Sequence, residues 1–174
     1  MKKVIVIALI LVMAVFASGC RDEPEELVFV VSFSYVCNEY VTTGDYDGHP
    51  LVFIRNQSMF AHESQQYLML LDDRLRNVPA GMDRAATMID DRVQFNSVTV
   101  RGGTAYVDMA GEDLFGSSLE ESLLISQIVS SLVVSFEEIE RVRFLIDGDA
   151  VDTLMGHIDT SEPFERGIYV TGLE

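Results

Sequence analysis

RVQFNSVTVRGGTAYVDMA, Arg92 to Ala110, gives the clearest indication of how this chain folds. Two runs in which apolar and polar residues alternate flank the triplet Arg101-Gly102-Gly103. Such alternation is typical of half-buried strands, and paired glycines readily adopt the positive φ angles that a tight hairpin turn requires. The segment therefore predicts an antiparallel hairpin.

The residues after this hairpin predict a long helix. Ser118 and Glu121 match the Ser-x-x-Glu capping box that begins many helices. The apolar residues that recur at helical intervals are Leu119, Leu123, Ile128, Leu132 and Phe136. The opposite face carries uncharged polar residues, namely Ser122, Ser126, Gln127 and Ser130. This face packs either under another part of its own fold or against a partner subunit, since interface cores are depleted of charge.

The remaining segments supply the other elements of the predicted fold. Residues 27–36 and 51–56 are rich in β-branched and aromatic residues and predict a first hairpin, and residues 142–146 predict a last strand. Residues 59–76 carry apolar residues at helical spacing. This order predicts an α/β fold, a two-layer sandwich in which a mixed β-sheet of about five strands has two main helices on one face, with an irregular C-terminal tail.

The N-terminal residues MKKVIVIALILVMAVFASGC have the three regions of a secretory signal peptide. Two lysines precede an apolar run from Val4 to Ala17, which is shorter than the roughly 20 residues that a membrane-spanning helix needs. A small Ser-Gly pair then precedes Cys20. We therefore expect residues 1–19 to be removed as a signal peptide.

Cys20 allows two forms of the mature protein. Ala17-Ser18-Gly19-Cys20 resembles the bacterial lipobox, in which the cysteine after the cut carries a lipid, although Ala17 stands where the lipobox most often has Leu. Lipidation at Cys20 would make residues 20–26 a lipidated cysteine and short tether, holding a single domain, residues 27–174, at the outer face of the cytoplasmic membrane. The alternative is ordinary secretion with the same cut, after which Cys20 and Cys37 could form a disulfide.

Charge limits the classes of partner. The chain has 12 Lys and Arg against 28 Asp and Glu, a net charge of −16. Removal of residues 1–19 would also remove both lysines, which lowers the charge to −18. A surface this acidic repels phosphates, so we expect no nucleic-acid partner and no electrostatic docking on anionic lipid headgroups. Attachment to the membrane would then depend on the lipid anchor.

No short catalytic motif occurs in the sequence. It lacks the G-x-S-x-G, H-E-x-x-H and G-x-x-x-x-G-K-[ST] patterns, and its three histidines, His49, His62 and His157, are scattered. Acidic turns at residues 45–48 and 147–152 resemble fragments of calcium loops but do not complete the spacing. We therefore expect neither an enzyme nor a resident cofactor or metal.

LMGHIDTSEPFERG, Leu154 to Gly167, is the densest cluster of metal-ligand residue types in the chain. A zinc site here would need a further ligand from elsewhere, and the sequence indicates none. Glycine and proline fix bends, and Asp and Ser side chains bond nearby backbone N–H groups. We interpret the segment as a tail that closes the fold. The residues of this candidate interaction or structural motif are Gly156, His157, Asp159, Ser161, Glu162 and Pro163.

Three segments, VRGGTAYVDMA, SFEEIERVRFLIDG and LMGHIDTSEPFER, resemble the GerMN domain, the sporulation and spore germination domain of bacterial envelope lipoproteins. Val107 to Ala110 match a Val-Asp-Leu-Ser-like motif, and Gly156 to Pro163 match a Gly-His-x-Asp-x-Ser-Glu-Pro motif throughout. The resemblance covers residues 91–167 well and residues 51–81 loosely. It implies an extracytoplasmic, non-enzymatic module with a compact α/β fold.

Two functions follow as expectations. The first is a lipid-anchored binding or scaffold domain that helps to assemble a cell-envelope or sporulation and germination complex, with other envelope proteins as partners. The second is a surface ligand-binding protein for cell-wall glycan, with peptidoglycan as a possible ligand, or for a divalent cation. The tyrosines Tyr35, Tyr40 and Tyr46 and the acidic turns suggest this alternative.

Overall fold

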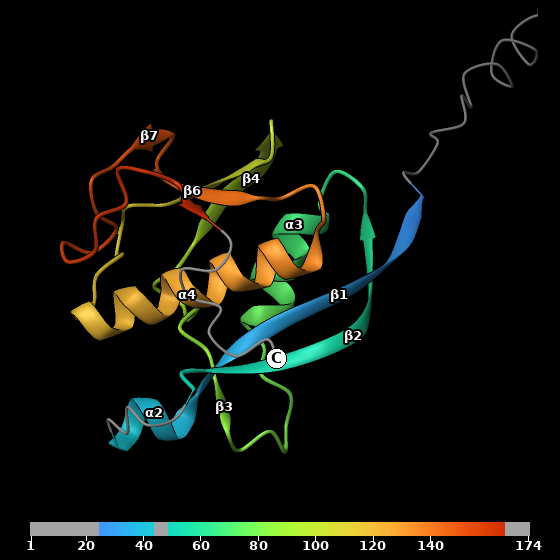
Figure 1. Cartoon of the computed structure of the whole chain (residues 1–174), viewed down its shortest axis with the longest axis horizontal. Coiled ribbons are helices and arrows are strands. Elements are labelled where there is room, and N and C mark those ends of the chain that lie inside the picture. Colours follow the sequence, from blue (N-terminus) through green and yellow to red (C-terminus); the bar gives the residue numbers. More distant parts are fainter. Residues whose placement is uncertain (1–24, 44–48, 166–174) are drawn as a thin grey trace, which may run out of the picture.

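Two β-sheets and one long helix form the fold in the computed structural model, which describes residues 25–43 and 49–165 (Figure 1). The three-stranded sheet has the order β2-β1-β3 and contains β1 (Glu26–Cys37), β2 (Leu51–His62) and β3 (Ala85–Ala86). The five-stranded sheet contains β4 (Phe95–Arg101), β5 (Thr104–Met109), β6 (Arg141–Ile146), β7 (Asp149–Ala150) and β8 (Phe164–Glu165). The described helices are α2 (Asn38–Thr43), α3 (Gln66–Met69), its continuation η1 (Leu70–Leu75), and α4 (Ser118–Ser135).

The five-stranded sheet confirms the α/β class and the mixed sheet expected from the sequence. β4 and β5 form the predicted antiparallel hairpin, with Val98 opposite Val107. Its turn uses Gly102 and Gly103 at φ angles of 55° and 76°, which are strained for residues with a Cβ atom. β6 then pairs with β5 in parallel, with Val107 opposite Phe144. Because α4 provides the crossover between them, β5, α4 and β6 form a β-α-β unit.

The first hairpin does not join this sheet, in contrast to the predicted single sheet. β1 and β2 pair with each other over most of their length, and β1 also pairs with the short β3. β2 continues to His62, so the helix expected over residues 59–76 begins only at Gln66. The cause is local alternation: Met59 and Ala61 are buried whereas Phe60 between them is exposed, which is the period of a strand and not of a helix.

The capping box of α4 occurs one residue earlier than predicted. Ser117 is the N-cap, and its hydroxyl accepts from the Glu120 N–H while the Glu120 carboxylate accepts from the Ser117 N–H. Ser118 and Glu121 therefore lie inside the helix. The shift leaves the Glu121 carboxylate available for a different role.

The uncharged face of α4 packs under β1, as the first of the two alternatives for it requires. The hydroxyl oxygens of Ser34 and Ser130 are 2.6 Å apart, and the Ser34 N–H donates to Ser131 Oγ at 3.0 Å. Ser135 Oγ donates to the Ser32 carbonyl at 2.7 Å. Small hydroxyl side chains allow this close approach, and their mutual hydrogen bonds offset the cost of burying them.

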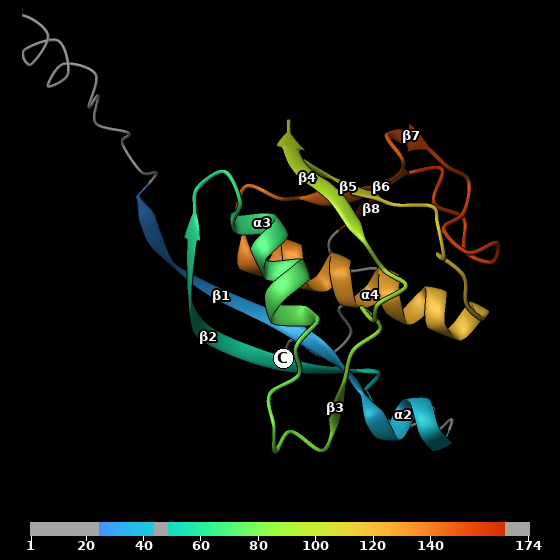
Figure 2. The same cartoon turned by 180° about the vertical axis from the view of Figure 1, so that it is seen from behind.

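The two main helices contact opposite faces of β1, so the prediction of a single helical face was wrong. Ser34 contacts α4, whereas the hydroxyl of the next residue, Tyr35, donates to the carbonyls of Arg74 and Asn77, at 2.7 and 3.0 Å, in and after η1. Successive side chains of a strand point to opposite sides. Accordingly α4 lies in front of α3 in Figure 1, and α3 lies in front of α4 in the reverse view of Figure 2.

Candidate functional site: the closing segment

A buried carboxylate on α4 holds the closing segment, residues 151–163, against the domain. Glu121 is 0 % exposed. Its Oε1 accepts from the backbone N–H groups of Leu154 and Met155, both at 2.9 Å. Its Oε2 accepts from those of His157 and Ile158, at 2.8 and 3.2 Å. Because a buried charge is costly without partners, these charge-assisted bonds are needed to keep the carboxylate inside.

The closing segment also satisfies its own polar groups. Thr160 donates its N–H to the Asp152 carbonyl and its hydroxyl to the Val151 carbonyl, at 2.8 and 3.0 Å. The Ser161 hydroxyl donates to Asp159 at 2.6 Å, followed by the Ser161 N–H at 2.9 Å. These two bonds, the hydroxyl first, lower the pKa of Asp159. Asp159 thus accepts from a nearby backbone N–H, whereas the Ser161 side chain bonds a carboxylate and not a backbone N–H as expected.

Apolar side chains and one special backbone angle complete the closure. Leu154 and Phe164 are buried in the main core, and the Phe164 ring meets the Phe144 ring of β6 edge-on with centroids 5.8 Å apart. Gly156 has a φ of 96° and open space where a Cβ would lie, so the backbone angle and not crowding requires glycine there. β8 then pairs with β6 and brings the chain back to the sheet.

The three residues that suggested a reactive cluster do not converge. His157, Asp159 and Glu162 are all exposed. The His157 ring Nε2–H donates to the Gly116 carbonyl at 3.1 Å, which fixes the ring at the start of α4. Over residues 25–43 and 49–165, no three His, Cys, Asp or Glu side chains are grouped as metal ligands.

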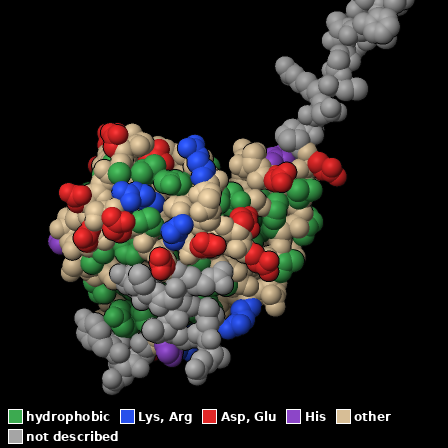
Figure 3. All heavy atoms as spheres, turned by 45° about the horizontal axis from the view of Figure 1, so that its top comes forward, with side chains coloured by type: hydrophobic (Ala, Val, Ile, Leu, Met, Phe, Trp, Pro, Cys, Tyr) green, Lys and Arg blue, Asp and Glu red, His purple; other side chains and the backbone are tan. Residues whose placement is uncertain are grey.

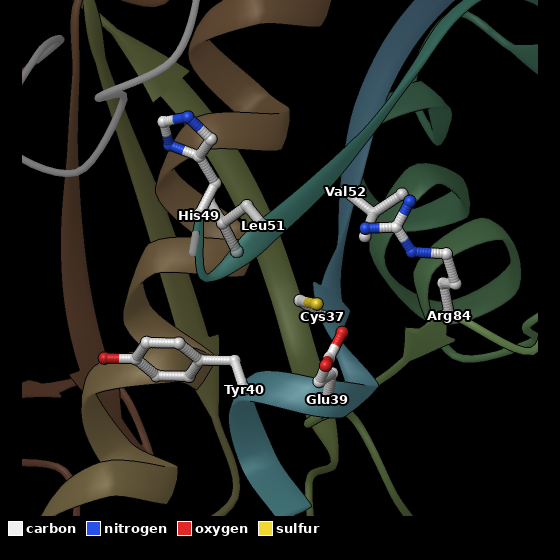
Figure 4. Close-up of a pocket in the computed structure, with 7 residues that line it drawn as sticks. All are labelled: Cys37, Glu39, Tyr40, His49, Leu51, Val52 and Arg84. Carbon is white, nitrogen blue, oxygen red and sulfur yellow. The ribbon is translucent and has the colours of Figure 1, made fainter. Parts of the chain in front are cut away.

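The other two histidines interact with separate groups. His62, at the end of β2, has its Nδ1 3.3 Å from the Glu25 carbonyl. His49 precedes β2 and lines a cavity of about 390 Å³ whose lining residues are Cys37, Glu39, Tyr40, His49, Leu51, Val52 and Arg84. In Figure 4 the His49 ring points away from the sulfur of Cys37. The described histidines therefore form no catalytic constellation with one another.

Several predicted sites lie outside the described residues. Cys20, Tyr46 and the acidic turn at 45–48 belong to this group, so lipidation of Cys20 and its pairing with the buried Cys37 stay predictions. Tyr35 is 1 % exposed, so this tyrosine cannot stack on a glycan. In the second acidic turn, Asp147 Oδ2 accepts from the Gly111 N–H at 3.2 Å and so holds a neighbouring loop.

Sequence reasoning missed an ion-pair network beside the closing segment. Arg92 donates to Asp90 at 2.7 Å, to Glu120 at 3.2 Å and to the Phe115 carbonyl at 3.0 Å. Its guanidinium also lies 5.3 Å from the centroid of the Phe115 ring, within cation–π range. The side chain of Arg92 lowers the pKa of Asp90, and hydrogen bonds from Ser117 and then Arg92 lower that of Glu120. The network joins the segment before β4 to the first turn of α4.

Comparison with solved structures supports this fold. The chain aligns with a candidate lipoprotein from Clostridium perfringens at 17% identity, covering 86% of this chain and 93% of that one with a TM-score of 0.52. It also aligns with the first GerMN domain of the sporulation protein GerM from Bacillus subtilis, at 15% identity, 78% and 98% coverage and a TM-score of 0.53. Against the tandem GerMN domains of GerM, the identity is 14% and the TM-score 0.58, with 80% of this chain and 47% of that chain covered. The TM-scores, which all exceed 0.5, show a shared fold.

Three further findings concern known relatives, membrane-spanning helices and family membership. A search of curated proteins finds no match. Within the described part of the chain, no helix combines the length and the apolar character that spanning a bilayer demands. A family model for sporulation and spore germination matches residues 52–152, which is more than half of the sequence. The chain therefore belongs to the Germane family, the family of that model.

Proposed function

We propose that this protein is a lipid-anchored, extracytoplasmic binding or scaffold domain that takes part in assembling a cell-envelope or sporulation and germination complex. The observation that carries the proposal is the family match over residues 52–152. The fold shared with a candidate lipoprotein of Clostridium perfringens and the Ser-Gly-Cys sequence at residues 18–20 support the anchor. Binding, and not catalysis, is the proposed activity.

The internal use of the closing segment supports a scaffold role. Its polar groups serve the fold: four of its backbone N–H groups donate to Glu121 of α4, and its Asp159 accepts from Ser161. A segment held at so many points keeps its shape when a partner binds, and preorganised surfaces lose less entropy on association. Such rigidity suits a module that must present a constant face to neighbouring proteins.

The anchor is tested by mass spectrometry of the mature N-terminal peptide. We expect cleavage before Cys20 and an added acyl mass on that residue. Cys20→Ser is the matched control, because it removes the lipid acceptor and should release the protein from membranes. An N-terminal peptide with an unmodified Cys20 would overturn the anchored form and favour secretion.

The assembly role is tested by cross-linking in intact cells, followed by purification from solubilised membranes. We expect envelope proteins to be enriched with the native chain and to be lost with Cys20→Ser, because the anchor raises the local concentration at the membrane. Recovery of no envelope protein above background, together with an unchanged envelope or sporulation phenotype on deletion, would contradict this role. Pelleting with purified peptidoglycan would instead favour the glycan-binding alternative.

A further inference from the structure

One end of the β1–β2 hairpin carries an exposed apolar face, which consists of Val28, Val30 and Phe60. These side chains are 59%, 65% and 58% exposed. Val28 lies directly opposite Phe60 in the antiparallel register, and Val30 follows two residues along β1. Directly paired residues, and residues two apart on a strand, share one side of a sheet. The three side chains therefore form a continuous surface.

The reverse side of the same hairpin end belongs to the core. Met59 is fully buried, and Phe29 packs against the main core cluster. The register of the β1–β2 pair shifts between Val31 and Phe33, and beyond this shift β1 is buried on both sides. Since core packing holds its reverse side, the apolar face has a fixed orientation.

This face lies beside the origin of the domain's tether. β1 begins at Glu26, six residues after Cys20, and six extended residues span at most about 20 Å. In Figure 3 hydrophobic side chains follow the right-hand side of the molecule. An anchor on Cys20 would hold Glu26 within this distance of the bilayer, and Val28 follows only two residues further along β1.

We propose that Val28, Val30 and Phe60 insert into the interfacial region of the bilayer to which Cys20 is anchored, and so fix the orientation of the domain on the membrane. This inference rests on the proposed lipid anchor. A tethered surface meets the membrane at high effective concentration, so a few apolar side chains suffice as a second attachment to one acyl anchor.

The size of the face favours a lipid surface over a second copy of the chain. A stable protein interface commonly uses roughly 20–30 residues on each side, whereas three side chains form this one. Exposed carboxylates of Glu25, Glu26 and Glu63 surround the hairpin end. They are repelled by anionic headgroups, so contact should be strongest on zwitterionic lipid.

The sequence contains no tryptophan, so one substitution provides a single fluorescent probe. The experiment reconstitutes the full lipidated Val30→Trp protein in phosphatidylcholine vesicles with or without lipids brominated along the acyl chains. Phe115→Trp is the matched control, because Phe115 is 61% exposed but lies before α4, away from the hairpin. Both variants should melt at the temperature of the unsubstituted protein.

Relative to the emission of Phe115→Trp, we expect the Val30→Trp emission to lie at shorter wavelength and to be quenched by the brominated lipid. The Phe115→Trp emission should be the same with and without brominated lipid. Adding Val28→Ser and Phe60→Ser to Val30→Trp should weaken the quenching, as should phosphatidylglycerol in the vesicles. If protein that floats with the vesicles shows no quenching at residue 30, the inference is wrong while the anchored function stands.

Two other results would also be decisive. A blue shift without quenching, accompanied by a doubled molecular mass in detergent, would mean that a second copy covers the face, which overturns the inference. Protein that does not float and carries no acyl mass would overturn the anchor itself, and the membrane contact with it.

Discussion

The closing segment and the free end of the β1–β2 hairpin are opposites in composition and in environment. The closing segment is rich in polar residues, yet Glu121 binds it tightly to the interior. The hairpin end is rich in valine and phenylalanine, yet Val28, Val30 and Phe60 face outward. From composition alone, we would expect the closing segment to face solvent and the hairpin end to pack into the core. The difference shows that a polar segment can be bound to the interior through its backbone N–H groups while its charged side chains stay exposed. It also shows that strand register can direct apolar side chains outward.

The largest effect is expected from Glu121→Ala. The substitution leaves four buried or part-buried backbone N–H groups without an acceptor, so the free energy of unfolding should fall by about 3–5 kcal/mol. Urea denaturation followed by circular dichroism measures this change. Glu121→Gln should cost less, because its amide oxygen still accepts. Glu120→Gln, one residue earlier and more exposed, is the control, and an equal loss for the two glutamines would contradict the anchoring role.

A smaller effect is expected at the contact between α4 and β1. Ser34→Ala removes the hydroxyl that meets Ser130 at 2.6 Å and should lower the free energy of unfolding by about 1–2 kcal/mol. Ser34→Ala combined with Ser130→Ala should cost less than the sum of the single changes, since neither hydroxyl is then left unpaired. Ser122→Ala serves as a control on the same helix. Strict additivity in this double-mutant cycle would contradict the contact.

The ion-pair network of Arg92 should have a still smaller effect, which depends on pH. Carboxyls whose pKa is lowered by folding, here Asp90 and Glu120, stabilise the protein above their unfolded pKa and lose this contribution as the pH falls through the folded pKa. The free energy of unfolding should therefore decline as the pH falls below about 5. Arg92→Gln should flatten this decline by less than about 1 kcal/mol, because the groups are solvent-screened. Arg55→Gln is the control, and equal slopes for both variants would refute the coupling.

The smallest effect on stability is expected on the apolar face. Val30→Ser and Phe60→Ser should each change the free energy of unfolding by less than about 0.5 kcal/mol, since neither side chain is buried. Met59→Ala, whose side chain is fully buried beside Phe60, should cost about 2–5 kcal/mol. The two substitutions therefore compare the stability contributed by the buried side and by the exposed side of one strand. Comparable losses at Met59 and Phe60 would show that the hairpin end is not free.

Much of the fold is predictable from local patterns. The β4–β5 hairpin and the last strand were expected from the glycine pair and from alternation, and both are confirmed. In the tail, Gly156 and Asp159, the turn residues from which a closing segment was predicted, lie at a positive φ angle and in a local hydrogen-bonded turn. These features depend on neighbours close in sequence. Local propensity therefore sufficed to find them.

The features that prediction missed depend on contacts distant in sequence. The separation into two sheets is one: β1 is buried by helices on both sides, and no local pattern states which sheet a hairpin will join. Glu121 is another, because its predicted place in a capping box hid an acceptor for groups more than 30 residues away. Two overlapping Ser-x-x-Glu patterns begin at Ser117 and Ser118. Since a helix has one N-cap, this overlap could have revealed that one of the two glutamates is not needed for the capping box.

The Glu121 contact has a consequence for the motions of the chain. Amides in an irregular loop ordinarily exchange with solvent quickly, but those of Leu154, Met155, His157 and Ile158 donate to a fully buried carboxylate. Their exchange requires release of this carboxylate, so hydrogen–deuterium exchange should show them as slow as the core of α4 and lost together with it in a single opening event. By this measure the closing segment belongs dynamically to the helix, although it has no helical structure of its own.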